Sequence, residues 1–87
     1  MDELVERVVL HNASVKNAVC CIEEMSELTK VLTKKLRNSE KFSREHLIEE
    51  LAHVLLMCNV IATEHGINHD DIFALQKDAV KRMEGGV

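Results

Sequence analysis

The sequence has no proline, no tryptophan and no tyrosine, and its 87 residues include only three glycines and two phenylalanines. Small β-sheet domains need turn residues at regular intervals and use aromatic side chains in their strands. This scarcity excludes an all-β fold. The chain is instead 46% apolar and 30% charged, a composition that predicts an all-α fold.

Further absences narrow the class of protein. The cysteines Cys20, Cys21 and Cys58 are odd in number, and we expect no secretory signal peptide, a cytoplasmic location, and thiols that act as small buried apolar groups. No apolar run approaches the roughly 18 residues of a membrane span. The net charge of −4 also argues against a nucleic-acid-binding surface, which is basic. We therefore expect neither a membrane nor a nucleic-acid partner.

The length predicts a single helical domain over residues 1–87. A domain of this size buries only about 60% of the surface that its unfolded chain exposes, and natural examples often add disulfides, a metal or a partner subunit. Because disulfides are not expected here, the size of the chain favours a helical oligomer, either with or without a bound metal.

Capping residues divide the chain into four predicted helices, one short, two long and one C-terminal. Serine and asparagine are good N-caps, Gly66 is suited to end a helix, and the last helix has acidic residues in its first turn and basic residues in its last. The predicted helices run from about Asp2 to His11, from Ser14 to about Arg37, from Ser43 to about His65, and from Asn68 through Lys81 and Arg82.

The third predicted helix is apolar on nearly all sides, so it has to be central, and one short chain can hardly cover it. A narrow stripe along it nevertheless carries polar groups and one methionine. Its members are His46, Glu50, His53, Met57 and Glu64. A carboxylate and an imidazole on a buried helix cost much free energy unless they are paired or bound to a metal.

Two pairs of residues that could bind a metal have the spacing that places both side chains on one face of a helix. Glu24 and Glu27 are three residues apart on the second predicted helix, and Glu50 and His53 are three apart on the third. A short connection makes these two helices antiparallel neighbours, so that the pairs can converge. Carboxylates forced together repel unless a divalent cation neutralises them, and Mg²⁺ is commonly held by a few carboxylates. The pattern therefore predicts a Mg²⁺ site.

The same residues resemble a known signature. The segment Glu23-Glu24-Met25-Ser26-Glu27, followed after 22 residues by Glu50-Leu51-Ala52-His53, is similar to the EExxE…ExxD motif of the MazG-type all-α nucleoside triphosphate pyrophosphohydrolases. The likeness extends from about Val15 to Met83. It implies a four-helix MazG-like bundle completed by oligomerisation, as a homodimer or a dimer of dimers. The implied reaction is metal-dependent cleavage of a nucleoside triphosphate substrate to the monophosphate and pyrophosphate.

The resemblance also implies roles for individual positions. It makes Glu24, Glu27, Glu50 and the residue at position 53 metal ligands, with Mg²⁺ as the expected ion and Mn²⁺ as an alternative. Glu23 would hold a further metal or orient the attacking water, so the implied catalytic acids are Glu23, Glu24 and Glu27. The implied substrate-binding residues are Asn17 near the base and Lys34, Lys77 and Lys81 at the phosphates.

One position departs from the family pattern. His53 stands where the family has aspartate, which removes one negative charge and replaces a hard oxygen by nitrogen. Imidazole suits Mn²⁺, Zn²⁺ or Fe²⁺ better than Mg²⁺. The departure leaves three outcomes open: a changed metal, weakened activity, or a retained fold without catalysis.

Two other functions fit the residues. Glu50-x-x-His53 is a Glu-x-x-His motif, and a symmetric dimer would supply two copies, as in di-iron carboxylate bundles, with Glu24 or Glu27 completing each site. Alternatively, the protein is a non-catalytic helical interaction protein whose acids line a hydrated groove. Lysines near a helix C-terminus are also favourable for dipole reasons alone, so the basic residues do not decide between these functions.

Overall fold

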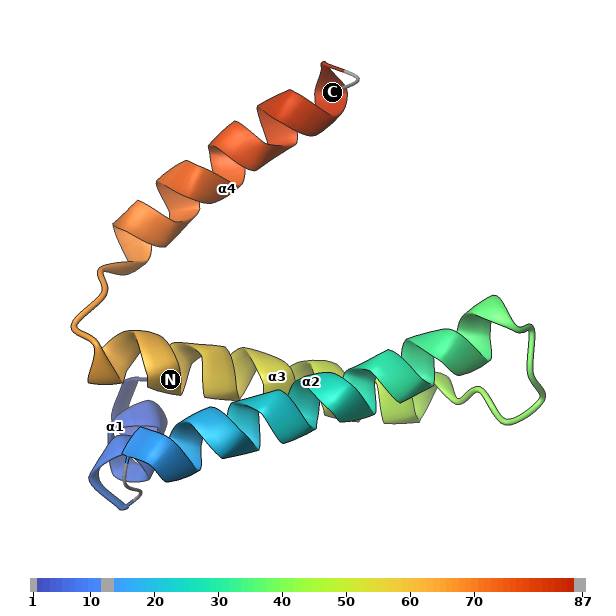
Figure 1. Cartoon of the computed structure of the whole chain (residues 1–87), viewed down its shortest axis with the longest axis horizontal. Helices are drawn as coiled ribbons and strands as arrows, with labels where there is room; N and C mark the ends of the chain where they lie inside the picture. Colours follow the sequence, from blue (N-terminus) through green and yellow to red (C-terminus); the bar gives the residue numbers. More distant parts are fainter. Residues whose placement is uncertain (1, 12–13, 86–87) are drawn as a thin grey trace.

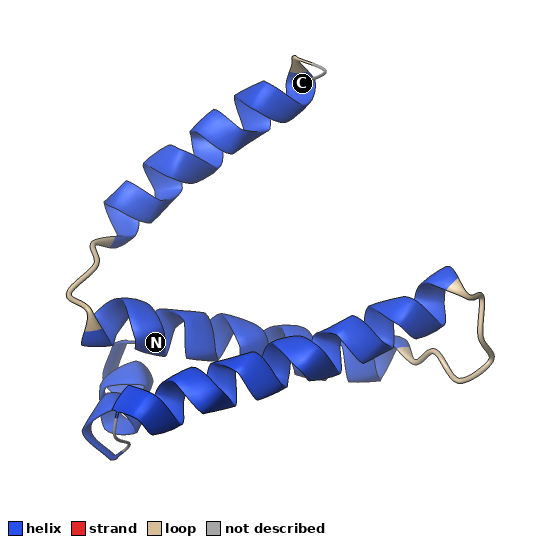
Figure 2. Cartoon of the chain, in the orientation of Figure 1, coloured by secondary structure: helices blue, strands red, loops and turns tan. Residues whose placement is uncertain are grey.

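The computed structural model describes residues 2–11 and 14–85, which form four α-helices and no strand (Figures 1 and 2). The prediction of an all-α fold with four helices is confirmed. The helices are α1 (Asp2–His11), α2 (Ser14–Leu36), α3 (Arg44–Glu64) and α4 (His69–Glu84).

The predicted caps form at Ser43, Asn68 and Gly66, whereas the side chain of Ser14, the other predicted N-cap, lies outside the described part of the chain. The Ser43 hydroxyl accepts a hydrogen bond from the backbone N–H of His46 at 3.2 Å and donates to the Glu45 carboxylate, also at 3.2 Å. The side chain of Asn68 accepts from the N–H of Asp70 at 2.8 Å. Gly66 has a φ of 63°, the left-handed conformation that glycine adopts readily at a helix C-terminus. These local interactions fix where α3 begins and ends and where α4 begins.

The helices α2 and α3 lie side by side and antiparallel, joined by residues 37–43, and α1 packs against α3 (Figure 1). The buried core lies where α1 meets both. It consists of Val5, Cys21, Met57 and Val60, with Val8, Val9, Cys20, Leu56 and Ile61 packed around it. Toward the other end of the pair, Val31 of α2 is also fully buried.

The helix α4 projects away from the other three (Figure 1), and none of its 16 residues is buried within the described chain. Its apolar side chains remain open, with Phe73 58% and Met83 76% exposed. The radius of gyration is 15.4 Å, whereas a compact domain of this length has about 12 Å. The described chain is therefore an open arrangement of helices and not a closed four-helix bundle.

The apolar character of α3 is greater than inspection of uninterrupted runs suggested. By length and composition alone, Arg44–Glu64 is apolar enough to cross a membrane, and only 22% of its most apolar stretch is buried. This is weak evidence for a membrane span, because central helices of water-soluble proteins pass the same test. Glu49, Glu50, His53 and Asn59 interrupt its apolar runs, so the sequence contains no uninterrupted apolar run of that length. Most of the apolar surface of α3 is left uncovered by the described chain.

The cap of α3 can be tested by removing its hydroxyl. We expect Ser43→Ala to lower the free energy of unfolding by about 1 kcal/mol, since one N-terminal N–H loses its acceptor. The matched control is Ser26→Ala. The Ser26 side chain is exposed in the middle of α2, where its hydroxyl donates to the carbonyl of Ile22 and where alanine is a better helix former. Urea unfolding of both variants at equal protein concentration would measure the difference. Equal effects would contradict the capping role.

Candidate metal centre

Three of the predicted ligands meet between α2 and α3. Glu24 of α2 and Glu50 and His53 of α3 each offer one donor atom, and these atoms lie within 4.8 Å of one another. His53 Nδ1 is 3.1 Å from Glu24 Oε2 and 3.8 Å from Glu50 Oε2. The three-residue spacing of Glu50 and His53 turns both side chains toward α2, and the antiparallel pairing of the helices brings Glu24 opposite them.

Glu50 is the least usual member of this cluster. It is only 6% exposed, and its Oε2 atom has no hydrogen-bond partner among the described residues. The imidazole of His46, one turn earlier on α3, lies 3.5 Å from the other carboxylate oxygen, Oε1. A buried carboxylate oxygen without a donor is costly, so a cation between Glu24, Glu50 and His53 would remove this cost.

A cavity of about 230 Å³ adjoins the cluster and is lined by Cys20, Glu24, His53, Leu56 and Met57. Its walls are mostly apolar apart from the two ligand side chains. Pockets that enclose a drug-sized molecule usually have roughly 300 to 1,000 Å³. The cavity of one chain can therefore take an ion with its waters, but it is small for a whole nucleotide.

The other two acids of the EExxE segment are not drawn into the cluster. Glu27 Oε1 lies 3.2 Å from Lys30 Nζ on the same helix, and Glu23 is exposed. Both remain within one turn of Glu24, but neither belongs to the group of converging donors among the described residues. Glu27 would have to leave Lys30 and change its side-chain conformation to reach the same ion.

The predicted substrate-binding residues are scattered. Asn17 is fully buried, and its side-chain amide donates a hydrogen bond to Glu64 of α3. Lys34 lies in the last turn of α2. Lys77 and Lys81 lie on α4, where Lys77 Nζ sits 4.9 Å from the centre of the Phe73 ring. Because α4 projects away from α2 and α3 (Figure 1), one chain does not bring these lysines to the acids.

Sequence inspection did not foresee every feature around the cluster. His46 belonged to the predicted polar stripe but received no role, although its spacing of four residues from Glu50 already placed it on the same face. Cys58 was expected to be buried and is exposed, whereas Cys21 is buried. Burial, and in second place the neighbouring Cys58 thiol, raises the pKa of Cys21, so that this thiol is less reactive than an exposed one.

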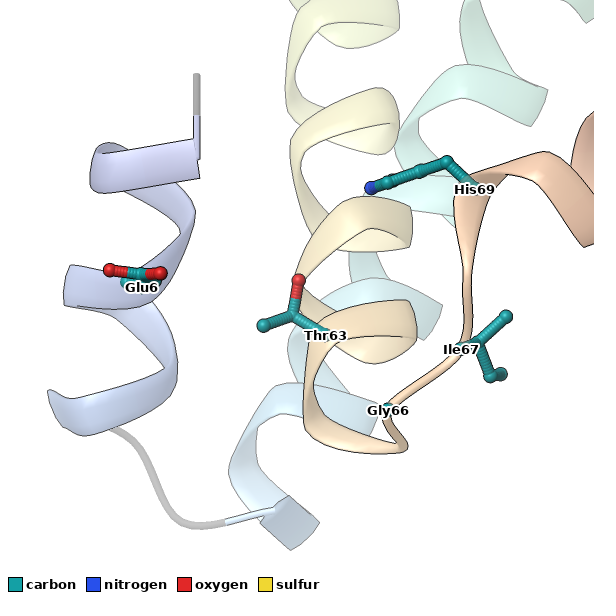
Figure 3. A pocket seen from close by; sticks show the side chains of 5 residues that line it. All are labelled: Glu6, Thr63, Gly66, Ile67 and His69. Carbon is teal, nitrogen blue, oxygen red and sulfur yellow. The ribbon is translucent and has the colours of Figure 1, made fainter.

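A second cavity lies at the far end of α3 and has a volume of about 290 Å³. Figure 3 shows its lining, contributed by α1, by α3 with the turn that follows it, and by the start of α4. The lining residues are Glu6, Thr63, Gly66, Ile67 and His69. It includes none of the predicted ligands, and no sequence motif pointed to it.

The carboxylate of Glu50, whose Oε2 atom lacks a hydrogen-bond partner among the described residues, predicts an unusual response to substitution. With a chelator present, we expect Glu50→Gln to raise the free energy of unfolding by about 1 kcal/mol, because a buried charge becomes a neutral amide that can donate to Glu24. Added divalent metal should stabilise the unsubstituted protein and not the variant.

The matched control for this test is Glu49→Gln, since Glu49 is the adjacent acid of α3 and is exposed. Its effect should stay within about 0.5 kcal/mol. Thermal or urea unfolding with and without chelator is the measurement. A clear loss of stability for Glu50→Gln in chelator would show that the carboxylate is well satisfied without a metal.

No family model, no curated protein and no solved structure matches this chain.

Proposed function

We propose that the chain is a subunit of a metal-dependent nucleoside triphosphate pyrophosphohydrolase of the MazG type. The observation that carries this proposal is the meeting of Glu24, from the EExxE segment, with Glu50 and His53, from the ExxH segment, around an unpartnered carboxylate oxygen. These are the positions at which the resemblance places metal ligands. A cytoplasmic location, where nucleoside triphosphates are abundant, is part of the proposal.

In the proposed reaction, the acids of α2 and α3 have different roles. Glu24, Glu50 and His53 would hold a divalent ion, which lowers the pKa of a bound water and offsets charge on the phosphoryl oxygens. The exposed carboxylate of Glu23 accepts the proton of the attacking water. The water oxygen bonds to the α-phosphorus as the bond from that phosphorus to the bridging oxygen breaks. Nucleoside monophosphate and pyrophosphate are the products.

The proposal includes assembly as a homodimer or a dimer of dimers. The apolar side chains of α4 and of the outer face of α3 are open to solvent in one chain, and exposed apolar surface of this extent marks a contact surface. The acid cluster and the basic residues Lys77 and Lys81 lie on separate arms of the chain (Figure 1). A second copy would supply these lysines to the substrate phosphates and enlarge the small cavity beside the acid cluster.

A dimeric di-iron carboxylate protein is the second candidate. One observation favours it: Glu50 lies between two imidazoles, with His46 beside Oε1 and His53 beside Oε2. A carboxylate with nitrogen donors on both sides suits a bridge between two iron ions. Stoichiometric iron in protein purified without oxygen would support this candidate over the hydrolase.

The hydrolase proposal is tested by pyrophosphate release from the common ribo- and deoxynucleoside triphosphates, with Mg²⁺ and with Mn²⁺. We expect release from at least one substrate. Because the ion would lose a charged ligand, Glu24→Gln or Glu50→Gln should lower the rate by more than about 100-fold. The resemblance extends the same expectation to Glu27→Gln.

Glu49→Gln is the control for this assay and should keep the full rate, because its side chain is exposed and outside the cluster. Absence of pyrophosphate from every substrate with both metals would overturn the proposal. So would an unchanged rate in Glu24→Gln.

The assembly proposal is tested by sedimentation velocity at micromolar concentration. We expect the unsubstituted protein to sediment as a dimer or tetramer, and Val80→Asp, which puts a charge on the apolar face of α4, to shift it toward monomer. Ala74→Asp introduces the same side chain on the polar side of the same helix and should leave the assembly intact. A stable monomer of the unsubstituted protein would contradict this part of the proposal.

A further inference from the structure

We propose that the cluster of Glu24, Glu50 and His53 selects a first-row transition ion, such as Zn²⁺ or Mn²⁺, over Mg²⁺, and that His46 positions Glu50 for this ion. The inference rests on the metal centre of the proposed function. It does not require that the bound ion support hydrolysis.

The donor set carries the first step. The converging atoms are one imidazole nitrogen and two carboxylate oxygens, whereas Glu27, the third carboxylate expected at this ion, is in contact with Lys30. Two carboxylates balance the charge of one divalent ion without excess negative charge. Mg²⁺ favours oxygen ligands and retains its waters, while imidazole binds Zn²⁺ and other first-row ions well. The mixed set therefore favours the transition ion.

The spacing of the donors is compatible with one shared ion of this class. Around a tetrahedral zinc ion with bonds of about 2.0 to 2.1 Å, donor atoms lie about 3.3 Å apart. His53 Nδ1 is 3.1 Å from Glu24 Oε2 and 3.8 Å from Glu50 Oε2, which bracket this value. Small side-chain rotations would bring all three onto one ion. The adjoining cavity, which Glu24 and His53 line, would leave room for water or substrate at such an ion.

The burial of Glu50 is an independent observation that points to a ligand. Its side chain is 92% buried, since only 8% is exposed, and Oε2 lacks a hydrogen-bond partner among the described residues while it faces His53. A solvated acidic face would leave this oxygen hydrated. An ion coordinated by Oε2 supplies the missing interaction.

His46 contacts the opposite oxygen of the same carboxylate, with Nε2 at 3.5 Å from Glu50 Oε1. It is outside the group of converging donors, so it acts on the ion through Glu50. Residues that orient a metal ligand in this way commonly contribute 10-fold to 100-fold in metal affinity. This assigns His46 a role that the resemblance does not contain.

Competition titrations of the full chain with a chelating dye would test the selectivity. We expect Zn²⁺ to bind at least about 100-fold more tightly than Mg²⁺, and His53→Asp to narrow this ratio at least 10-fold by weakening Zn²⁺ and strengthening Mg²⁺. His53→Asn, which has no negative charge, serves as a second variant should the aspartate disturb the fold. His65→Asp is the matched control, because His65 is an exposed histidine at the end of α3, and should leave the ratio unchanged.

The role of His46 needs a readout that separates positioning from coordination. We expect His46→Ala to weaken Zn²⁺ binding about 10-fold, and His46→Gln, which keeps an N–H donor, to restore most of the affinity. With Co²⁺ bound, both His46 variants should have the same visible absorption spectrum as the unsubstituted protein, because the ligands are unchanged. The spectrum should shift in His53→Asp, which replaces a ligand.

Equal affinity for Zn²⁺ and Mg²⁺, or an unchanged ratio in His53→Asp and His53→Asn, would overturn the inference. An altered Co²⁺ spectrum in His46→Ala would make His46 a ligand and overturn its positioning role. Failure of the proposed function has a different signature: zinc selectivity without pyrophosphate release from any substrate removes the hydrolase and leaves the metal site. Pyrophosphate release together with tighter binding of Mg²⁺ than of Zn²⁺ would support the hydrolase and overturn the inferred metal selectivity.

Discussion

The carboxylate of Glu50 sits on the most apolar helix of the chain and is nearly excluded from water. A charge in that position requires compensation from its neighbours, and the neighbours are an acid, Glu24, and two imidazoles. The repulsion between the two acids and the lack of a donor at Oε2 mean that the described residues alone compensate it incompletely. The pairing of α2 with α3, which forces Glu24 opposite Glu50, thus stabilises the fold and creates the demand for a cation.

The local part of the fold followed from the sequence. Ser43, Gly66 and Asn68 each act within a few residues of themselves, so their capping roles and the helix ends near them could be predicted. The direction of α4 could not be predicted. No residue of α4 is buried against the other described helices, and residues 65–68 alone do not fix its direction. The sequence thus predicted that one chain would leave the third helix incompletely covered, but not where α4 would lie.

The candidate site was likewise predicted only in part from the sequence. Helical spacing predicted that Glu24, Glu50 and His53 would converge, because helix periodicity and antiparallel pairing decide which face each occupies. It could not predict that Glu27 contacts Lys30, since both side chains lie on the solvent-exposed side of α2 and a side-chain rotation decides whether Glu27 points to Lys30 or to the cluster. Nor could it predict that Asn17 is buried against Glu64, a contact that depends on how the start of α2 meets the end of α3.

The helix α4 has a consequence for how this protein holds its shape. A 16-residue helix is only marginally stable in water when nothing packs against it, and α4 has no buried residue in its own chain to hold it. Its order therefore depends on the amount of covering surface present in solution. The helical content of the protein should fall on dilution, and cells that make little of it would hold a larger fraction with a frayed C-terminal arm open to proteolysis.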